Sequence, residues 1–107
     1  MPAKITSVDN YNNINKIDFG EKVIFFKFTG EWCKPCKALE KNLECISDII
    51  VYNIDIDNED FESFLEKSNI TTIPYTIMKY KNKTMHFKGL RETHEIVDMI
   101  NILKQAR

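Results

Sequence analysis

Residues 22–37 read KVIFFKFTGEWCKPCK and contain the two clearest structural signals of the chain. The first part, residues 22–29, is aromatic or β-branched at most positions, as expected for a central strand buried on both faces. A helix is predicted from Pro35 to about Ile46, because apolar residues recur there at helical spacing. Cys33 and Cys36 therefore lie at the junction between the strand and the helix.

The position of these two cysteines points to redox chemistry. A thiol in the first turn of a helix faces unpaired backbone N–H groups and the positive end of the helix dipole, which favour the reactive thiolate. A second cysteine one turn later lies on the same side of the helix, close enough for a small disulfide ring. A C-x-x-C spacing is weak evidence by itself, and its place at the end of a strong strand makes it informative.

The other elements follow from apolar periodicity and turn residues. In chain order they are a strand over 5–8, a helix over 9–18, a strand over 49–56, a helix from about 59, strands over 75–80 and 84–88, and a last helix after Gly89. Asp57 or Asn58 is expected to cap the helix from about 59, and its inward-facing residues are expected to be Phe61, Phe64 and Leu65. This order, β-α-β-α-β-α-β-β-α, predicts an α/β fold. We expect a mixed sheet of about five strands flanked by about four helices, in a single domain over residues 1–107.

Composition excludes several classes of protein. The net charge of −1, from 15 basic and 16 acidic residues, argues against binding to nucleic acid. No apolar run approaches the roughly 18–20 residues that cross a bilayer, and the N-terminus does not resemble a secretory leader. With 3 cysteines, an odd number, a disulfide framework is not expected. We therefore expect a cytoplasmic protein without a membrane segment.

An ordered set of landmarks resembles the thioredoxin family. The landmarks are Gly30–Lys37 with the strand before them, Asp55-Ile56-Asp57, Ile73-Pro74 and Gly89, and they span almost the whole chain. Trp32 before the cysteines and the long two-stranded ending resemble thioredoxin more than glutaredoxin. The resemblance implies the thioredoxin fold and disulfide exchange without a prosthetic group.

The resemblance also implies roles for residues at the dithiol. Cys33 is expected to be the exposed attacking thiol, and Cys36, partly buried, the resolving thiol of a redox-active Cys33–Cys36 disulfide. Pro35 fixes φ and is expected to stiffen the loop between them. Trp32 is expected at the rim beside Cys33, as a groove wall and not as part of the core.

A substrate groove is implied on the other side of the dithiol. Pro74 is expected to be a cis proline packed against the cysteines, with Ile73 offering its backbone to an extended substrate segment. Tyr75 and Gly89 are expected to border the same groove. Thr29 and Tyr75 differ from the residues usual in the family, which indicates a different substrate preference.

Lys27 is the main departure from the family pattern, because thioredoxins keep a buried Asp at this strand position. A cation near the dithiol favours thiolates and so makes the disulfide more oxidising, and Lys34 between the cysteines acts weakly in the same direction. Alternatively, burial makes Lys27 a neutral proton acceptor. In a third reading its ammonium reaches water and affects neither thiol.

Together these features predict a disulfide oxidoreductase that reduces protein disulfides and acts as a monomer. Electrons are expected from an upstream enzyme similar to thioredoxin reductase, or from the glutathione system. One alternative is an enzyme of the same fold that favours disulfide formation or isomerisation. Another is a binding module with little turnover, against which the intact cysteines and proline argue.

Three further features have simpler interpretations. Cys45 is expected to be a small hydrophobic residue in helix packing, with a regulatory or dimer-forming thiol as the alternative. His86 and His94 match no common zinc spacing, so no metal is expected. Lysines cluster around the final hairpin, where they guard an edge strand or, alternatively, dock an acidic partner: Lys79, Lys81, Lys83 and Lys88.

Overall fold

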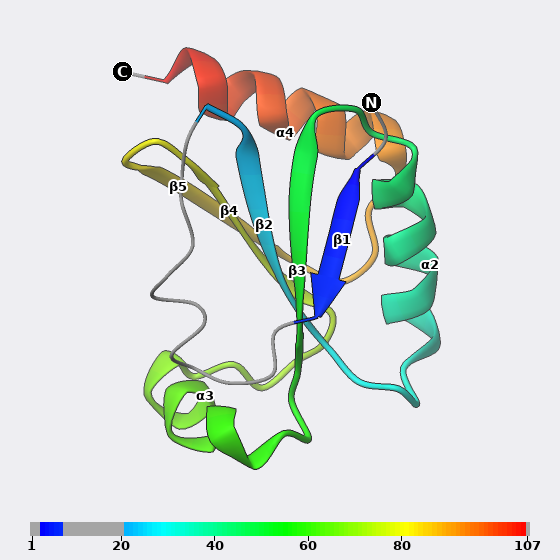
Figure 1. Ribbon diagram of the computed structural model, residues 1–107, viewed down its shortest axis with the longest axis vertical. Helices are drawn as coiled ribbons and strands as arrows, with labels where there is room; N and C mark the ends of the chain where they lie inside the picture. Colours follow the sequence, from blue (N-terminus) through cyan, green and yellow to red (C-terminus); the bar gives the residue numbers. More distant parts are fainter. Residues whose placement is uncertain (1–2, 8–20, 107) are drawn as a thin grey trace.

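The computed structural model describes residues 3–7 and 21–106. They form a five-stranded sheet in which β1, β2 and β3 run parallel, while β4 is antiparallel to β2 and β5 to β4 (Figure 1). The strand order is β1-β3-β2-β4-β5, so the predicted mixed sheet is confirmed. The strands are β1 (Lys4–Ser7), β2 (Val23–Thr29), β3 (Ile49–Asp55), β4 (Tyr75–Tyr80) and β5 (Lys83–Lys88).

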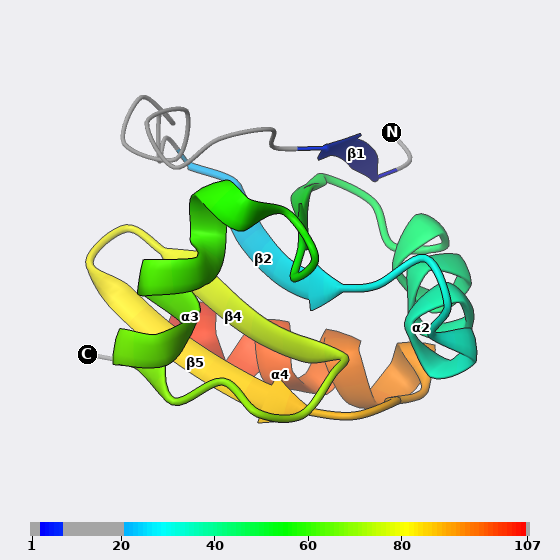
Figure 2. The ribbon, with the colours of Figure 1, turned by 90° about the horizontal axis from the view of Figure 1, so that it is seen from below.

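Helices cover both faces of this sheet. Those described are α2 (Lys34–Glu44), the short 3-10 helix η1 (Glu59–Phe61), α3 (Glu62–Ser68) and α4 (Thr93–Gln105). α2 and α4 lie on one face and α3 lies on the other (Figure 2). The described residues thus contain three α-helices where about four were expected, and the helix predicted over 9–18 lies outside them. None of the helices described is both long and apolar enough to cross a membrane.

The turn before α3 is capped as one of the two alternatives predicted. The Oδ1 atom of Asn58 accepts the backbone N–H of Asp60 at 3.0 Å, so Asn58 and not Asp57 is the cap. The first residues of the predicted helix form η1 before α3 begins at Glu62. Phe61 is fully buried, and Phe64 and Leu65 pack partly buried beside it, as expected.

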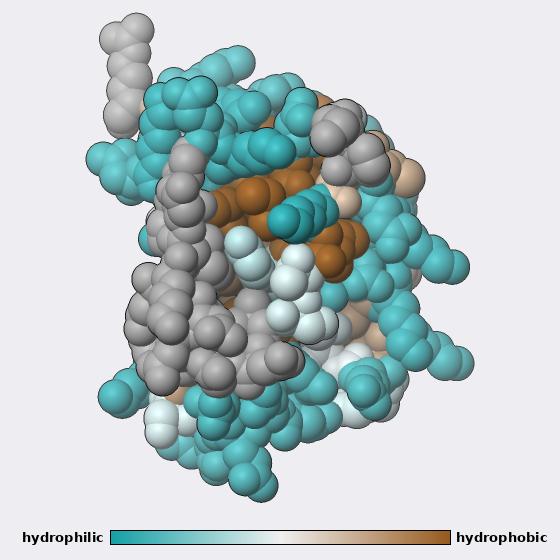
Figure 3. Space-filling view, viewed as in Figure 1, coloured by the Kyte–Doolittle hydropathy of each residue, from teal (hydrophilic) through white to brown (hydrophobic). Residues whose placement is uncertain are grey.

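β2 divides the core in two, because alternate residues of a strand point to opposite faces. Val23 and Phe25 point toward α2 and α4, whereas Ile24, Phe26 and Phe28 point toward α3. Hydrophobic side chains are also visible over the upper parts of β2 and β3 in the view of Figure 3. The α2/α4 cluster consists of Val23, Phe25, Leu39, Leu43, Ile46, Ile49, Val51, Met78, Phe87, Ile96, Ile100 and Leu103.

Lys27 interrupts this apolar pattern at the centre of the sheet. It follows Phe25 by two residues and therefore points to the α2/α4 face. It pairs in register with Asn53 of β3 and with Thr76 of β4. A row of three polar residues consequently crosses the middle of the sheet beneath α2.

The final hairpin connects to the loop before β4 through Gly89. Two residues, 81–82, join β4 to β5, one fewer than predicted, and Lys81 adopts a left-handed φ of 56° there. Gly89 follows β5 with φ of 78°, and its N–H donates to the carbonyl of Pro74 at 2.8 Å. The end of β5 is therefore fixed to the loop that precedes β4.

We expect Gly89→Ala to lower the free energy of unfolding by about 1–2 kcal/mol, because a residue with a Cβ is strained at this positive φ. No atom lies within 4 Å of the position of the added Cβ, so the loss comes from the backbone and not from a clash. Gly89→Asn is the matched control and should lose less, since Asn tolerates left-handed backbone better. Urea denaturation measures both, and equal stability of Gly89→Ala and wild type would contradict this reading.

Candidate active site

The two cysteines meet at the N-terminus of α2. Cys33 is the N-cap residue of this helix, and Cys36 lies in its first turn. They form a disulfide with Cα atoms 5.3 Å apart, and the backbone N–H of Cys36 donates to Sγ of Cys33 at 3.2 Å. Pro35 occupies the first turn as well, where a missing N–H costs no helical hydrogen bond. A thiolate of Cys33 would thus be stabilised by an N–H donor and the helix dipole.

Cys33 is less exposed than the sequence predicted. It is 4% exposed, compared with 1% for Cys36, so the expectation of an exposed Cys33 is wrong for this disulfide form. The reason is its capping position, which turns Sγ back over the first turn toward the N–H of Cys36. Cys33 is still the more accessible of the two cysteines in the disulfide, and Lys34 beside it is exposed.

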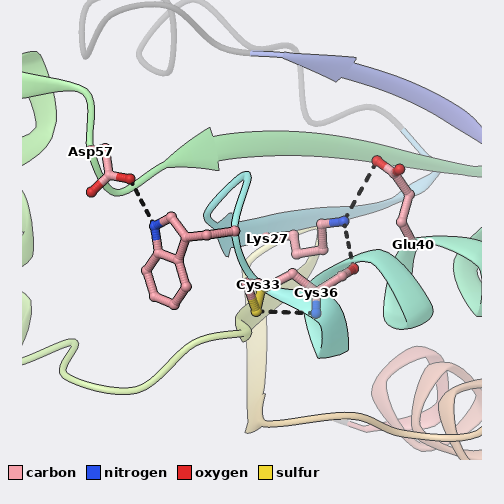
Figure 4. Close-up of a disulfide and its surroundings, with 6 residues drawn as sticks. Lys27, Cys33, Cys36, Glu40 and Asp57 are labelled. Carbon is pink, nitrogen blue, oxygen red and sulfur yellow. Dashed lines mark hydrogen bonds and ion pairs between the residues drawn. A yellow bond between two sulfur atoms is a disulfide. The ribbon is translucent and has the colours of Figure 1, made fainter.

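Trp32 forms part of the rim of the site, as predicted. Its side chain is 65% exposed, and its Nε1 donates to Oδ2 of Asp57 at 3.0 Å (Figure 4). A Cβ on Gly30 would lie 3.0 Å from the Trp32 ring and 3.3 Å from Cδ1 of Ile73. Because Gly30 has no side chain, the side chains of Trp32 and Ile73 can both pack close to its backbone.

The predicted groove residues lie at the start of β4 and the end of β5. The Ile73–Pro74 peptide bond is cis, as the family resemblance implied, and Pro74 is buried. Gly89 contacts Pro74 through the backbone hydrogen bond described above. Tyr75 packs its ring near Phe28, with centroids 6.2 Å apart. Ile73, Pro74 and Gly89 are thus brought together, and the role of this surface in substrate binding stays a prediction.

Lys27 is buried directly behind the resolving cysteine. It is 1% exposed, its Nζ lies 3.4 Å from the carbonyl oxygen of Cys36, and Oε1 of Glu40 lies 3.6 Å away (Figure 4). The reading in which the ammonium reaches water is therefore wrong. Burial lowers the pKa of Lys27 below its ordinary 10.5, and the Glu40 carboxylate partly opposes this shift.

Two polar residues beside Lys27 were missed at the level of sequence. Glu40 comes four residues after Cys36 on α2, and its Oε1 also accepts a hydrogen bond from Nδ2 of Asn53 at 2.8 Å. The available signals were the i, i+4 spacing, which places Glu40 on the face of Cys36, and a polar residue inside the apolar run of β3. Neither signal reveals that the helix and the two strands meet at Lys27.

Cys45 does not pack in the core. α2 ends at Glu44, and Cys45 is an exposed free thiol at the C-cap, with Leu43 and Ile46 buried on either side. Two residues correspond to about 200° around a helix, so a position two residues after an inward Leu43 faces outward. The prediction that Cys45 packs as a small hydrophobic residue is wrong.

Lys27 should make stability depend on pH in the alkaline range. Between its lowered folded-state pKa and 10.5, the unfolded chain binds more protons than the folded chain, so the free energy of unfolding rises with pH. Relative to Lys27→Met, we expect wild type to gain stability as the pH rises from the lowered folded-state pKa of Lys27 toward 10.5. Urea denaturation of both proteins across this range measures the effect, and a constant difference would contradict the pKa shift.

Comparisons with known proteins agree with this geometry. The family model described as Thioredoxin matches residues 3–102. Thioredoxin-1 of Drosophila melanogaster is 27% identical over 99% of this chain and 100% of that protein, and the thioredoxin of Chlamydia caviae is 26% identical over 92% and 96%. The crystal structure of chloroplastic thioredoxin z superposes with a TM-score of 0.79 over 97% of both chains at 18% identity, which shows a shared fold.

Proposed function

The chain belongs to the thioredoxin family, and on this premise we propose that it works as a reductant of disulfide bonds in protein substrates. Family and fold make it a dithiol–disulfide oxidoreductase, and the family as a whole acts on protein disulfides and receives electrons from reductases. The observation that carries the proposal is the Cys33–Cys36 disulfide at the N-terminus of α2, beside the exposed Trp32. The cytoplasmic location and the monomeric state remain predictions.

The proposed reaction begins at Cys33. Its thiolate attacks one sulfur of the substrate disulfide, forming a mixed disulfide and releasing the first substrate thiolate. Cys36 then loses its proton and attacks Sγ of Cys33, which releases the second substrate thiolate and forms the Cys33–Cys36 disulfide. Two electrons pass to the substrate. A reductase similar to thioredoxin reductase, or glutathione, returns the pair to the dithiol form.

Lys27 favours a second candidate, an enzyme that forms or isomerises disulfides. A buried cation 3.4 Å from the Cys36 carbonyl would stabilise thiolates and raise the reduction potential. However, Glu40 lies 3.6 Å from the same amine, and its negative charge offsets that of Lys27. The charge balance of this pair therefore supports the reductant over the oxidant.

The two candidates are separated by direct assays of both directions. We expect the reduced protein to cleave insulin disulfides catalytically when NADPH is supplied with thioredoxin reductase, or with glutathione and glutathione reductase. We expect poor oxidation of a reduced, unfolded protein such as ribonuclease by the disulfide form. Efficient oxidation without insulin reduction in either donor system would overturn the proposal.

A further inference from the structure

The loop between β5 and α4, residues 89–92, is held to the rest of the protein at both of its ends. At its first end, the N–H of Gly89 donates to the carbonyl of Pro74 at 2.8 Å. Near its second end, Nδ2 of Asn42 in α2 donates to the carbonyl of Arg91, also at 2.8 Å. This β5–α4 loop therefore connects the segment before β4 to the helix that carries the dithiol.

Asn42 makes a second hydrogen bond at the start of α4. Its carbonyl accepts Oγ1–H of Thr93 at 3.1 Å. Asn42 lies in the last turn of α2, where a carbonyl has no regular partner within the helix, so the Thr93 hydroxyl satisfies a group that the helix leaves open. The start of α4 lies beside α2 in both ribbon views (Figure 1 and Figure 2). Asn42 is thus both donor and acceptor where the two helices meet.

The two hydrogen bonds of Asn42 join distant parts of the chain. They span 49 and 51 residues of sequence, and both Asn42 and Thr93 are partly shielded from water. The first turn of α4 is fixed separately by a capping box, in which the N–H of Glu92 donates to Oε1 of Glu95 at 3.0 Å. The loop is therefore attached to a well-defined helix start, and Asn42 determines where that start lies relative to α2.

The β5–α4 loop borders the predicted substrate groove. Gly89 is bonded to Pro74 of the cis peptide, and Leu90, the next residue, is 43% exposed and available to contact a substrate. The Arg91 guanidinium lies over the Phe87 ring, 5.9 Å from its centroid, and its Nη1 donates to the carbonyl of Leu90 at 3.4 Å. A shift of the loop relative to α2 would therefore move Leu90 relative to the dithiol.

We propose that Asn42 is a positioning residue that sets the width of the substrate groove by holding the β5–α4 loop against α2. The proposal rests on the proposed function, because it requires protein substrates to bind along Pro74 and this loop. Asn42 comes six residues after Cys36, about 9 Å further along α2, so it does not touch the reacting sulfur atoms. Loss of its side chain weakens the binding of protein substrates and leaves the reactivity of the dithiol unchanged.

Steady-state kinetics separate these two effects. In a Cys45→Ser parent, which lacks the exposed free thiol, we expect Asn42→Ala to raise KM for insulin about three- to tenfold at unchanged kcat. The loop then occupies its binding position for a smaller fraction of the time, which lowers the apparent affinity by that fraction. The reduced variant should react with dithiobis(nitrobenzoate), a small disulfide, at the parental rate. Asn101→Ala, at an exposed position of α4, is the matched control and should change neither value.

The Thr93 hydroxyl provides an independent pair of variants. Thr93→Val keeps the shape of the side chain and removes the donor, so it should also raise KM for insulin. Thr93→Ser keeps the donor and should retain the parental KM. An unchanged KM in Asn42→Ala, or an equal loss of its rate with dithiobis(nitrobenzoate), would overturn the proposal.

Amide hydrogen exchange tests the position of the loop without a substrate. Asn42→Ala should accelerate exchange of the Gly89 amide, which is bonded to Pro74, by a larger factor than exchange of the Phe25 amide in the central strand β2. Equal acceleration of both amides would indicate a general loss of stability and would contradict the positioning role. A parent protein that reduces no insulin would refute the proposed function, whereas selective acceleration at Gly89 would still support the attachment of the loop by Asn42.

Discussion

Disulfide reduction should fall by a factor on the order of 10³ or more in Cys33→Ser, because a serine hydroxyl cannot replace the thiolate nucleophile. The helix N-terminus that stabilises a thiolate does not make serine reactive at neutral pH, and Cys36 alone is less accessible to substrate. Insulin reduction with a saturating electron donor measures this loss.

Two further cysteine variants make this result specific. Cys45→Ser removes a thiol that is exposed and outside the disulfide, and it should keep wild-type turnover. Cys36→Ser should retain the attacking thiol and accumulate a mixed disulfide with substrate, detectable by mass spectrometry. Substantial activity in Cys33→Ser, or loss of activity in Cys45→Ser, would contradict the assignment of the nucleophile.

Leu39→Ala should lower the free energy of unfolding by about 2–5 kcal/mol, because it removes a fully buried side chain and leaves a cavity. Leu39 lies on α2 three residues after Cys36 and packs into the α2/α4 cluster, so it fixes the helix that carries the dithiol. The loss is a large fraction of the stability of a domain this size.

The control for this variant is Ile102→Ala in α4. Ile102 is 58% exposed, so its truncation should change the free energy of unfolding by less than about 0.5 kcal/mol. Urea denaturation compares both variants with wild type. Equal losses would show that the packing of α2 onto the sheet does not have the importance assigned to it here.

The sequence was most informative where one physical signal dominated. Residues 23–28 are all buried, as an aromatic and β-branched run broken only by Lys27 predicts, and α2 and α4 follow their apolar periodicity. The cis Ile73–Pro74 bond was implied by family resemblance, since X-Pro bonds are rarely cis in general. The helix predicted over 9–18 is outside the described residues.

The details that escaped prediction depend on the ends of helices and on contacts between distant segments. The burial of Cys33 and the exposure of Cys45 both follow from where α2 begins and ends, which periodicity locates only to within a few residues. The pairing of Lys27 with Glu40 and Asn53 depends on how β2 and β3 are registered and how α2 packs above them. No local pattern contains this information.

The burial of Lys27 changes how the family departure is understood. Of the three readings of Lys27, its burial excludes the one in which the ammonium reaches water. The two that remain are a cation near the dithiol and a neutral proton acceptor, and in both the Glu40 carboxylate lies beside the amine. A Lys27–Glu40 pair that shares a proton is neutral overall, so it does not strongly favour the thiolate form of the dithiol.

The reduction potential of the Cys33–Cys36 couple tests the proposed direction of electron flow most directly. It can be measured in Cys45→Ser by equilibration with glutathione buffers of defined ratio at neutral pH, with the oxidised fraction read from thiol alkylation. We expect a single two-electron couple below about −220 mV, within or below the range of the cytosolic glutathione poise. A potential near −180 to about −120 mV, the range of disulfide isomerases and oxidases, would contradict the reductase function.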